Sequence, residues 1–211
     1  MVMTDYTTKS VSPVWKQNYD LGWPFFQFTD NEFVSKGICW FTAWREWPIR
    51  ISVSHCGVCV GPDECIEALA GGVKLSNLHD RFDDPHTHVF FRKPAWYDRE
   101  PCTGRRLSNA AYELRGSPYA YSLIVAKAFT QSPIGRGLNR LFCGKMSPLL
   151  CTLAHWPGTM DCDGVVGRVI REAGHWEGCL RKGRNVNALT PQIIFEDQEL
   201  FCPWLGARID D

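Results

Sequence analysis

The spacing of apolar residues after Cys162 predicts the helix around which the rest of the chain is organised. These residues fall on one helical stripe: Val165, Val166, Val169, Ile170 and Ala173. Gly174 is a typical C-terminal stop, and either Asp161 or Asp163 is suited to cap the N-terminus, because a side-chain oxygen can accept a bond from a free backbone N–H. The pattern therefore places Cys162 at the start of a half-buried helix.

Residues 49–60 change to a period of two, which is typical of a strand. The turn residues Gly61-Pro62-Asp63 follow, and Cys65 to Leu69 is expected to be the return strand of a hairpin. Two further short strands are predicted over residues 73–75 and 88–92. Together these segments predict an antiparallel sheet.

Several other stretches favour helix or loop. Tryptophans at helical spacing, Trp40, Trp44 and Trp47, indicate that the aromatic-rich segment 25–47 is a helix packed on the core. Residues 107–130 also carry helical patterns, residues 131–160 are expected to be loop-rich because they contain many Gly and Pro, and Thr190-Pro191 has the form of a helix start. The sequence predicts a loosely ordered leader over residues 1–20 and one α+β domain over residues 21–211.

Composition narrows the function classes. The 23 basic and 23 acidic side chains cancel, so net charge makes no case for binding nucleic acid or an anionic membrane surface. No apolar run approaches the roughly 18 residues of a membrane span. The first twenty residues lack the apolar stretch of a secretory signal. The ten cysteines are therefore expected to be reduced in a cytoplasmic protein, or in one exported by a route that needs no N-terminal signal.

Cys162 is the candidate nucleophile. The free N–H groups and the positive dipole end at a helix N-terminus stabilise a thiolate, which is the reactive form of cysteine. The alternative is that Cys162 is simply a small buried residue, which is the commoner role of a free cysteine.

A cysteine nucleophile needs a base, and six histidines compete for that role. His55 lies within a strongly patterned strand, where a polar ring requires a partner. His155 lies seven residues before Cys162 and is expected to line the site from a loop. His86 and His88 have the spacing of two metal ligands on one strand face, but without matched cysteine or carboxylate ligands we predict no metal site.

Glu67 is the candidate group that orients the base. A three-residue loop at 61–63 places Gly57 opposite Glu67, so that Glu67 and His55 share one face of the hairpin. A two-residue loop would place them on opposite faces, and Glu67 would then be a surface residue that forms a salt bridge. Cys56 and Cys59 match C-x-x-C, but inside a strand the two thiols point to opposite faces, which disfavours a redox or zinc motif.

Taken in order along residues 35–200, five short motifs resemble those of the NlpC/P60 superfamily of papain-like cysteine hydrolases. The resemblance is to its circularly permuted YiiX-like and lecithin:retinol-acyltransferase-like (LRAT-like) branch, in which the histidine and glutamate strands precede the cysteine helix. The motifs are Ser54–Gly61, Ile66–Ala68 with Gly72-Val73, Gly116–Tyr119, Asp161–Gly164 and Thr190-Pro191.

The resemblance implies a single circularly permuted papain-like domain, with an antiparallel sheet packed against helices and the nucleophile at a helix N-terminus. It implies that Cys162 is the nucleophile, His55 the base and Glu67 the group that orients His55. The implied activity is that of a thiol protease or amidase that needs no cofactor. The expected targets are peptide or isopeptide bonds, above all those of bacterial peptidoglycan.

Further expectations follow from the same resemblance. Tyr119, His155 and Trp40 are candidate substrate-binding residues. If the protein is an exported toxin effector, an immunity or inhibitor protein is a further expected partner. The family usually has Ser where this chain has Asp163, and two carboxylates beside the thiol should raise its pKa unless both point away as caps. A lipid acyltransferase or thioesterase of the same fold, and a catalytically inactive binding module, are the alternatives.

Overall fold

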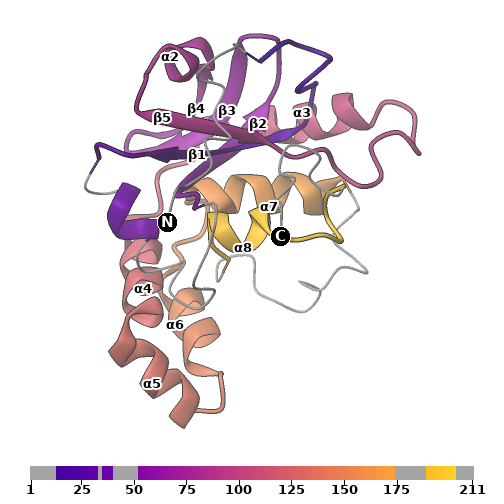
Figure 1. The fold of residues 1–211 in the computed structure, drawn as a ribbon. Coiled ribbons are helices and arrows are strands. Elements are labelled where there is room, and N and C mark those ends of the chain that lie inside the picture. The colour runs from indigo at the N-terminus through magenta and orange to yellow at the C-terminus, as the bar shows by residue number, and fades with distance from the viewer. Residues whose placement is uncertain (1–12, 33–34, 40–51, 174–188, 203–211) are drawn as a thin grey trace, which may run out of the picture.

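The computed structural model describes residues 13–32, 35–39, 52–173 and 189–202 and contains a five-stranded antiparallel sheet with helices packed against it (Figure 1). The strand order is β4-β3-β2-β1-β5, and every neighbouring pair is antiparallel. The strands are β1 Pro24–Thr29, β2 His55–Cys59, β3 Glu64–Leu69, β4 Gly72–Asn77 and β5 Thr87–Phe91. The fold is therefore α+β, as the sequence predicts.

One helix, α7, lies along the sheet and is central to the packing (Figure 1). It contacts β2, β3, α3 and α8. The helices are α2 His79–Phe82, α3 Thr103–Glu113, α4 Tyr121–Gln131, α5 Pro133–Leu141, α6 Met146–Ala154, α7 Cys162–Glu172 and α8 Pro191–Phe195. Helices α4, α5 and α6 project away from the sheet, and we call residues 121–156 the three-helix arm (Figure 1).

Most residues of β2 and β3 are buried on both faces, which explains why most of them are apolar. Val58 and Ile66 point toward α7 and join its stripe in the main core. On the opposite face, Cys59 and Cys65 join a second cluster that also contains Tyr19. Residues 13–20 of the predicted leader are among the described residues, and within them Tyr19 is buried against the sheet.

The aromatic segment 25–47 begins with a strand, and the prediction of a helix there is wrong for its first residues. In β1, Phe25 enters the second cluster and Phe26 enters the main core, so successive rings cover the two faces of the sheet. A strand buried on both faces shows no alternation of polar and apolar residues, and this removed the usual signal. Residues 35–39 of the same segment are helical, as predicted, and residues 40–47 lie outside the described part of the chain.

The prediction of loops over residues 131–160 is also wrong, because α5 and α6 occupy much of this stretch. Ser132 caps α5 by accepting a hydrogen bond from the Gly135 N–H, and Pro133 occupies its first turn. Proline at that position favours a helix, since the first N–H groups of a helix have no partner in any case. None of the helices in the described ranges is long and apolar enough to cross a membrane.

Candidate active site

The helix predicted after Cys162 is confirmed as α7, with Cys162 as its first residue. Asp161 is the N-cap, and its carboxylate accepts a hydrogen bond of 3.1 Å from the Gly164 N–H. A Cβ atom at Gly164 would lie 2.6 Å from Asp161 Oδ1, so only glycine leaves room for this cap. Asp161 and Gly164 together therefore fix the helix start that holds the thiol.

The predicted register of the β2–β3 hairpin is confirmed, because Gly57 pairs with Glu67 and the Val60 N–H donates to the Glu64 carbonyl at 2.9 Å. This register brings His55 Nε2 to 2.6 Å from Glu67 Oε2. Glu67 is fully buried, whereas the His55 side chain keeps 17% of its surface exposed. The alternative of a surface Glu67 is therefore excluded.

Gly57 has a steric role beside His55. A Cβ atom at this position would lie 2.6 Å from the Phe25 ring and 2.7 Å from the Ile66 carbonyl. Without it, the Phe25 ring packs directly over the strand, and its centroid lies 6.1 Å from that of the His55 ring. The phenyl ring therefore forms one wall beside the imidazole.

Cys162 and His55 both line the cavity described below, and each shifts the pKa of the other. Because Nε2 of His55 faces Glu67, Nδ1 is the nitrogen left for the thiol. Burial alone would lower the pKa of His55, but the bonds to Cys162 and Glu67 outweigh it and raise the pKa to about 9. At Cys162, hydrogen bonding from Cys56, and to a smaller extent from His55, outweighs the effect of burial and holds the pKa of the thiol well below its usual range. These shifts favour a thiolate–imidazolium pair.

Cys56 is a site residue that the sequence did not indicate. Burial, with a further contribution from Cys162, raises the pKa of Cys56 well above its usual range. Cys56 therefore stays protonated and can donate its S–H to the Cys162 sulfur. Cys59 lies in the cluster on the opposite face of the sheet, as predicted, so Cys56 and Cys59 do not form a paired motif.

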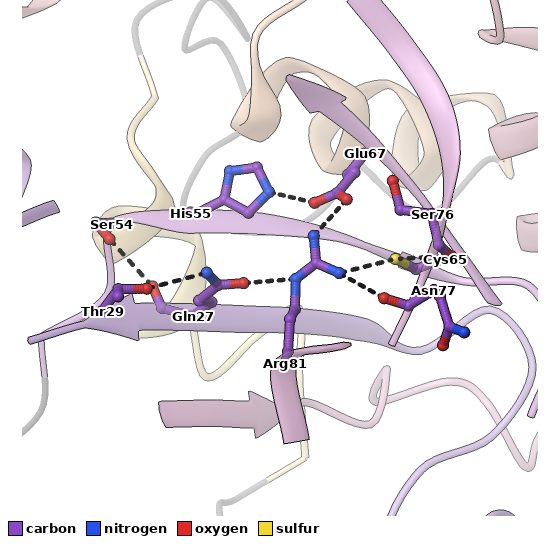
Figure 2. A network of polar contacts seen from close by, with 9 residues as sticks. All are labelled: Gln27, Thr29, Ser54, His55, Cys65, Glu67, Ser76, Asn77 and Arg81. Atoms are coloured by element: carbon purple, nitrogen blue, oxygen red, sulfur yellow. Dashed lines mark hydrogen bonds and ion pairs between the residues drawn. The ribbon is translucent and has the colours of Figure 1, made fainter. Parts of the chain in front are cut away.

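Glu67 is held by a second partner, Arg81 of α2 (Figure 2). The Arg81 guanidinium donates to Glu67 Oε1, to Gln27 Oε1 at 2.7 Å and to the Asn77 carbonyl at 2.9 Å. Burial would raise the pKa of Glu67, but His55 and Arg81 outweigh it and lower the pKa to about 2. Glu67 is therefore a fixed anion that accepts from His55 on one oxygen and from Arg81 on the other.

Lys127 of α4 pairs with the two aspartates beside Cys162, which were expected to raise the pKa of the thiol. Its ammonium donates to Asp161 Oδ2 and to Asp163 Oδ2, each at 2.5 Å. Burial, with the neighbouring Asp161, raises the pKa of Asp163 well above its usual range, although Lys127 opposes that shift. Lys127 thus partners both carboxylates, and Asp161 only partly offsets the groups that lower the pKa of Cys162.

A cavity of about 470 Å³ opens beside Cys162 and His55. Tyr119 lines it, which agrees with its predicted place in the site, and burial raises the pKa of its hydroxyl. His155 follows α6 and is not among the described residues that line the cavity. Trp40, the third residue expected to bind substrate, lies outside the described part of the chain. Its role therefore remains a prediction.

The His86 and His88 pair shares one carboxylate, with Asp30 accepting from His86 at 2.8 Å and lying 3.4 Å from His88. Across the described ranges, no group of three or more His, Cys, Asp or Glu side chains is arranged to hold a metal ion. His86 and His88 are therefore explained by ion pairing with Asp30.

The site thus joins a thiol at a helix N-terminus, an imidazole and a buried carboxylate, which is the set of groups that nucleophilic acyl transfer requires. No protein-family model, curated protein or solved structure matches the chain. The resemblance to the permuted NlpC/P60 branch is therefore a resemblance of sequence motifs.

Proposed function

We propose that the protein is a cysteine hydrolase of the permuted papain-like type, an amidase or endopeptidase that works through a thioester acyl-enzyme. The observation that carries this proposal is the bond of 2.6 Å between His55 Nε2 and the fully buried Glu67, which leaves Nδ1 for Cys162. Such an orienting bond fixes the ring and favours its protonated form, as a thiolate–imidazolium pair requires.

The reaction begins with attack of the Cys162 thiolate on a substrate carbonyl carbon, which forms a C–S bond and places negative charge on the carbonyl oxygen. The backbone N–H of Cys162, at the start of α7, contributes to the oxyanion hole that stabilises that charge. The intermediate then collapses and the C–N bond breaks, while the imidazolium of His55 gives its proton to the leaving amine. His55 next takes a proton from water, which attacks the thioester carbon; the C–S bond then breaks, releasing the acid and restoring the Cys162 thiolate beside the His55 imidazolium.

The first candidate substrate is a peptide or isopeptide bond, with peptidoglycan peptides as the first class to screen because of the family resemblance. A lipid acyl group is the second candidate, and one observation favours it. The cavity beside Cys162 has apolar walls contributed by Leu69, Ile124 and Ala128, which suit an acyl chain. Both candidates use the same thioester step.

Alkylation with limiting iodoacetamide from about pH 5 to 9, followed by peptide mapping, tests the proposal. We expect Cys162 to react first among the ten cysteines near pH 6 and to lose that lead in His55→Ala. His86→Ala, which removes an exposed histidine away from the cavity, is the matched control. If Cys162 reacts no faster than the other cysteines, the hydrolase proposal fails and an inactive binding module becomes the better account.

Substrate class is then decided by turnover. Wild-type protein and Cys162→Ala are incubated with muropeptides and, separately, with acyl thioesters of increasing chain length. Preferential cleavage of muropeptides supports the peptidase, whereas a rate that rises with acyl-chain length supports the lipid alternative.

A further inference from the structure

The three-helix arm differs from the rest of the protein in its surface. Ten large apolar side chains are exposed in the described ranges, and nine of them lie between Tyr121 and Trp156. The exception is Val14. Large exposed apolar patches are uncommon on water-facing surfaces and usually mark contact with another molecule or a membrane.

These side chains follow the helical repeat. Tyr121, Val125 and Phe129 lie at intervals of four residues along α4. Leu149, Leu153 and Trp156 form a second stripe along and just beyond α6, and Leu153 and Trp156 are 73% and 74% exposed. A stripe of this kind is normally the face that a helix buries.

The distal part of the arm is also apolar. Helix α5 lies furthest from the sheet, and it ends at Leu141, which is 75% exposed and is followed by the exposed Phe142 (Figure 1). The exposed cations Arg140 and Lys145 flank this pair. Apolar residues between cations are typical of segments that enter the interfacial layer of a membrane, where the cations remain at the headgroups.

The charge of the arm is one-sided. Residues 114–160 contain no Asp or Glu. The arm itself contains four Lys and Arg residues, so the rest of the chain holds 19 basic and 23 acidic side chains. The neutral total therefore combines a formal charge of +4 in the arm with −4 elsewhere. Inside the arm, Lys127 is neutralised by the site carboxylates, but Arg140 and Lys145 are exposed.

The arm has its own small core. Leu123 of α4 and Cys151 of α6 pack together with Ala120. The Ser122 hydroxyl donates to the Ala154 carbonyl at 2.6 Å, and the Ser147 N–H donates to the Asn139 side chain at 2.9 Å. Its exposed apolar residues are thus presented by a packed unit.

From these observations we propose that the three-helix arm is a membrane-binding element that enters the interfacial layer of an anionic lipid bilayer through Leu141 and Phe142, without spanning it. Exposure on α4, on α6 and at the end of α5 suits immersion in lipid, and the absence of acidic side chains suits a negatively charged surface. This proposal does not depend on the proposed chemistry.

Vesicle co-sedimentation tests the proposal, with vesicles of phosphatidylcholine alone and with about 30% phosphatidylglycerol. We expect Cys162→Ala protein, which carries an intact arm, to bind the anionic vesicles more tightly. Leu141→Ser with Phe142→Ser should lower the partition coefficient about tenfold or more, because two inserting side chains are lost. Val14→Ser, which changes the exposed apolar residue outside the arm, should leave it unchanged.

Separate variants test the electrostatic contribution of the arm to vesicle binding. Arg140→Ala with Lys145→Ala should reduce the preference for anionic vesicles by about fivefold per cation, whereas Arg105→Ala on α3 should not change it. Failure of the intact arm to bind either vesicle overturns the proposal, and so does unchanged binding by the Leu141 and Phe142 variant. Self-association or binding to another protein without vesicle binding also overturns it.

A second measurement avoids variants that disturb the arm. Cys143, after α5, and Cys102, before α3, are both exposed thiols. In the Cys162→Ala background, an environment-sensitive dye is placed on Cys143 with Cys102→Ser, or on Cys102 with Cys143→Ser, and peptide mapping confirms its position. We expect dye emission to rise on anionic vesicles only at Cys143, and equal responses at the two positions contradict insertion of the arm.

Discussion

The active-site cavity and the three-helix arm differ in which side chains they bury: the site buries charged side chains, and the arm exposes apolar ones. Around Cys162, the buried acidic side chains Glu67, Asp161 and Asp163 all have basic partners. In the arm, apolar side chains that a helix normally buries face solvent. In the first region, partners of opposite charge offset the cost of excluding water from buried charges, whereas the second region suits a less polar environment than water. Helix α4 belongs to both, because its buried Lys127 serves the site while Val125 is exposed.

The largest expected effect is on turnover, which should depend on the active site and not on the three-helix arm. Cys162→Ala should reduce turnover about 10⁴-fold, because it removes the nucleophile. Leu153→Ser in the arm should leave turnover of a water-soluble substrate unchanged. Steady-state kinetics on whichever substrate the screen identifies measures both, and equal losses would show that the arm takes part in the chemistry.

The link between the regions is tested by Lys127→Met, which leaves Asp161 and Asp163 buried without their cation. We expect the free energy of unfolding to fall by about 3–5 kcal/mol, because breaking a buried ion pair exposes the cost of the remaining charge. Urea denaturation measures this, and Lys145→Met, at an exposed position of the arm, is the control. Adding Asp163→Asn to Lys127→Met should recover part of the loss.

Removal of the Cys56 thiol is expected to have an intermediate effect. Cys56→Ala takes away the S–H donor, so the pKa of Cys162 should rise and its alkylation near pH 6 should slow about tenfold. Cys59→Ala removes an equally buried thiol from the opposite face of the sheet and should leave the rate unchanged. Equal rates for the two variants would show that Cys56 only fills space.

A smaller effect concerns pH. The pKa of His55 is raised to about 9, so the imidazolium that protonates the leaving group persists up to that pH and is lost above it. Activity should therefore fall as pH increases through about 9. In Glu67→Gln the carboxylate that raises this pKa is gone, and the fall should begin at lower pH. A pH–rate profile with the same upper limit in both proteins would contradict the role of Glu67.

The smallest effect concerns the stability of the arm surface. Leu153→Ser should change the free energy of unfolding by no more than about 0.5 kcal/mol, because Leu153 is already solvated. Leu107→Ala, at a fully buried leucine of α3, should cost about 2–5 kcal/mol. Thermal or urea denaturation compares them, and a large loss in Leu153→Ser would mean that this side chain is packed in solution.

Local patterns were sufficient to predict the main parts of the site. Apolar spacing predicted the helix start at Cys162, and loop length predicted the register that brings Glu67 to His55. Arg81 could not be predicted, because it lies in the short polar helix α2 and its partner is set by the tertiary fold. Lys127 left a usable signal, since it shares the buried face of α4 with Leu123 and Thr130.

The charge of the arm and the strand β1 were not predicted, because total charge and periodicity are averages over many residues. The formal charge of the whole chain is zero, and that value hides the acid-free stretch of residues 114–160. The rings of Phe25 and Phe26 lie on opposite faces of β1, so neither a helical nor an alternating pattern appears. A total charge does not contain the positions of the charges along the chain, and short-range periodicity does not show that a strand is buried on both faces.

The attachment of the three-helix arm has a consequence for how such a protein can be modified. Tyr119 and Met160 form a bridge at the base of the arm, so the chain leaves the domain and returns to it at one place. A short loop could therefore close the gap if the arm were removed. Lys127 would leave with it, however, and both Asp161 and Asp163 would lose their counter-ion. The arm is a detachable module only in a chain that also carries neutral residues, such as Asn, at positions 161 and 163.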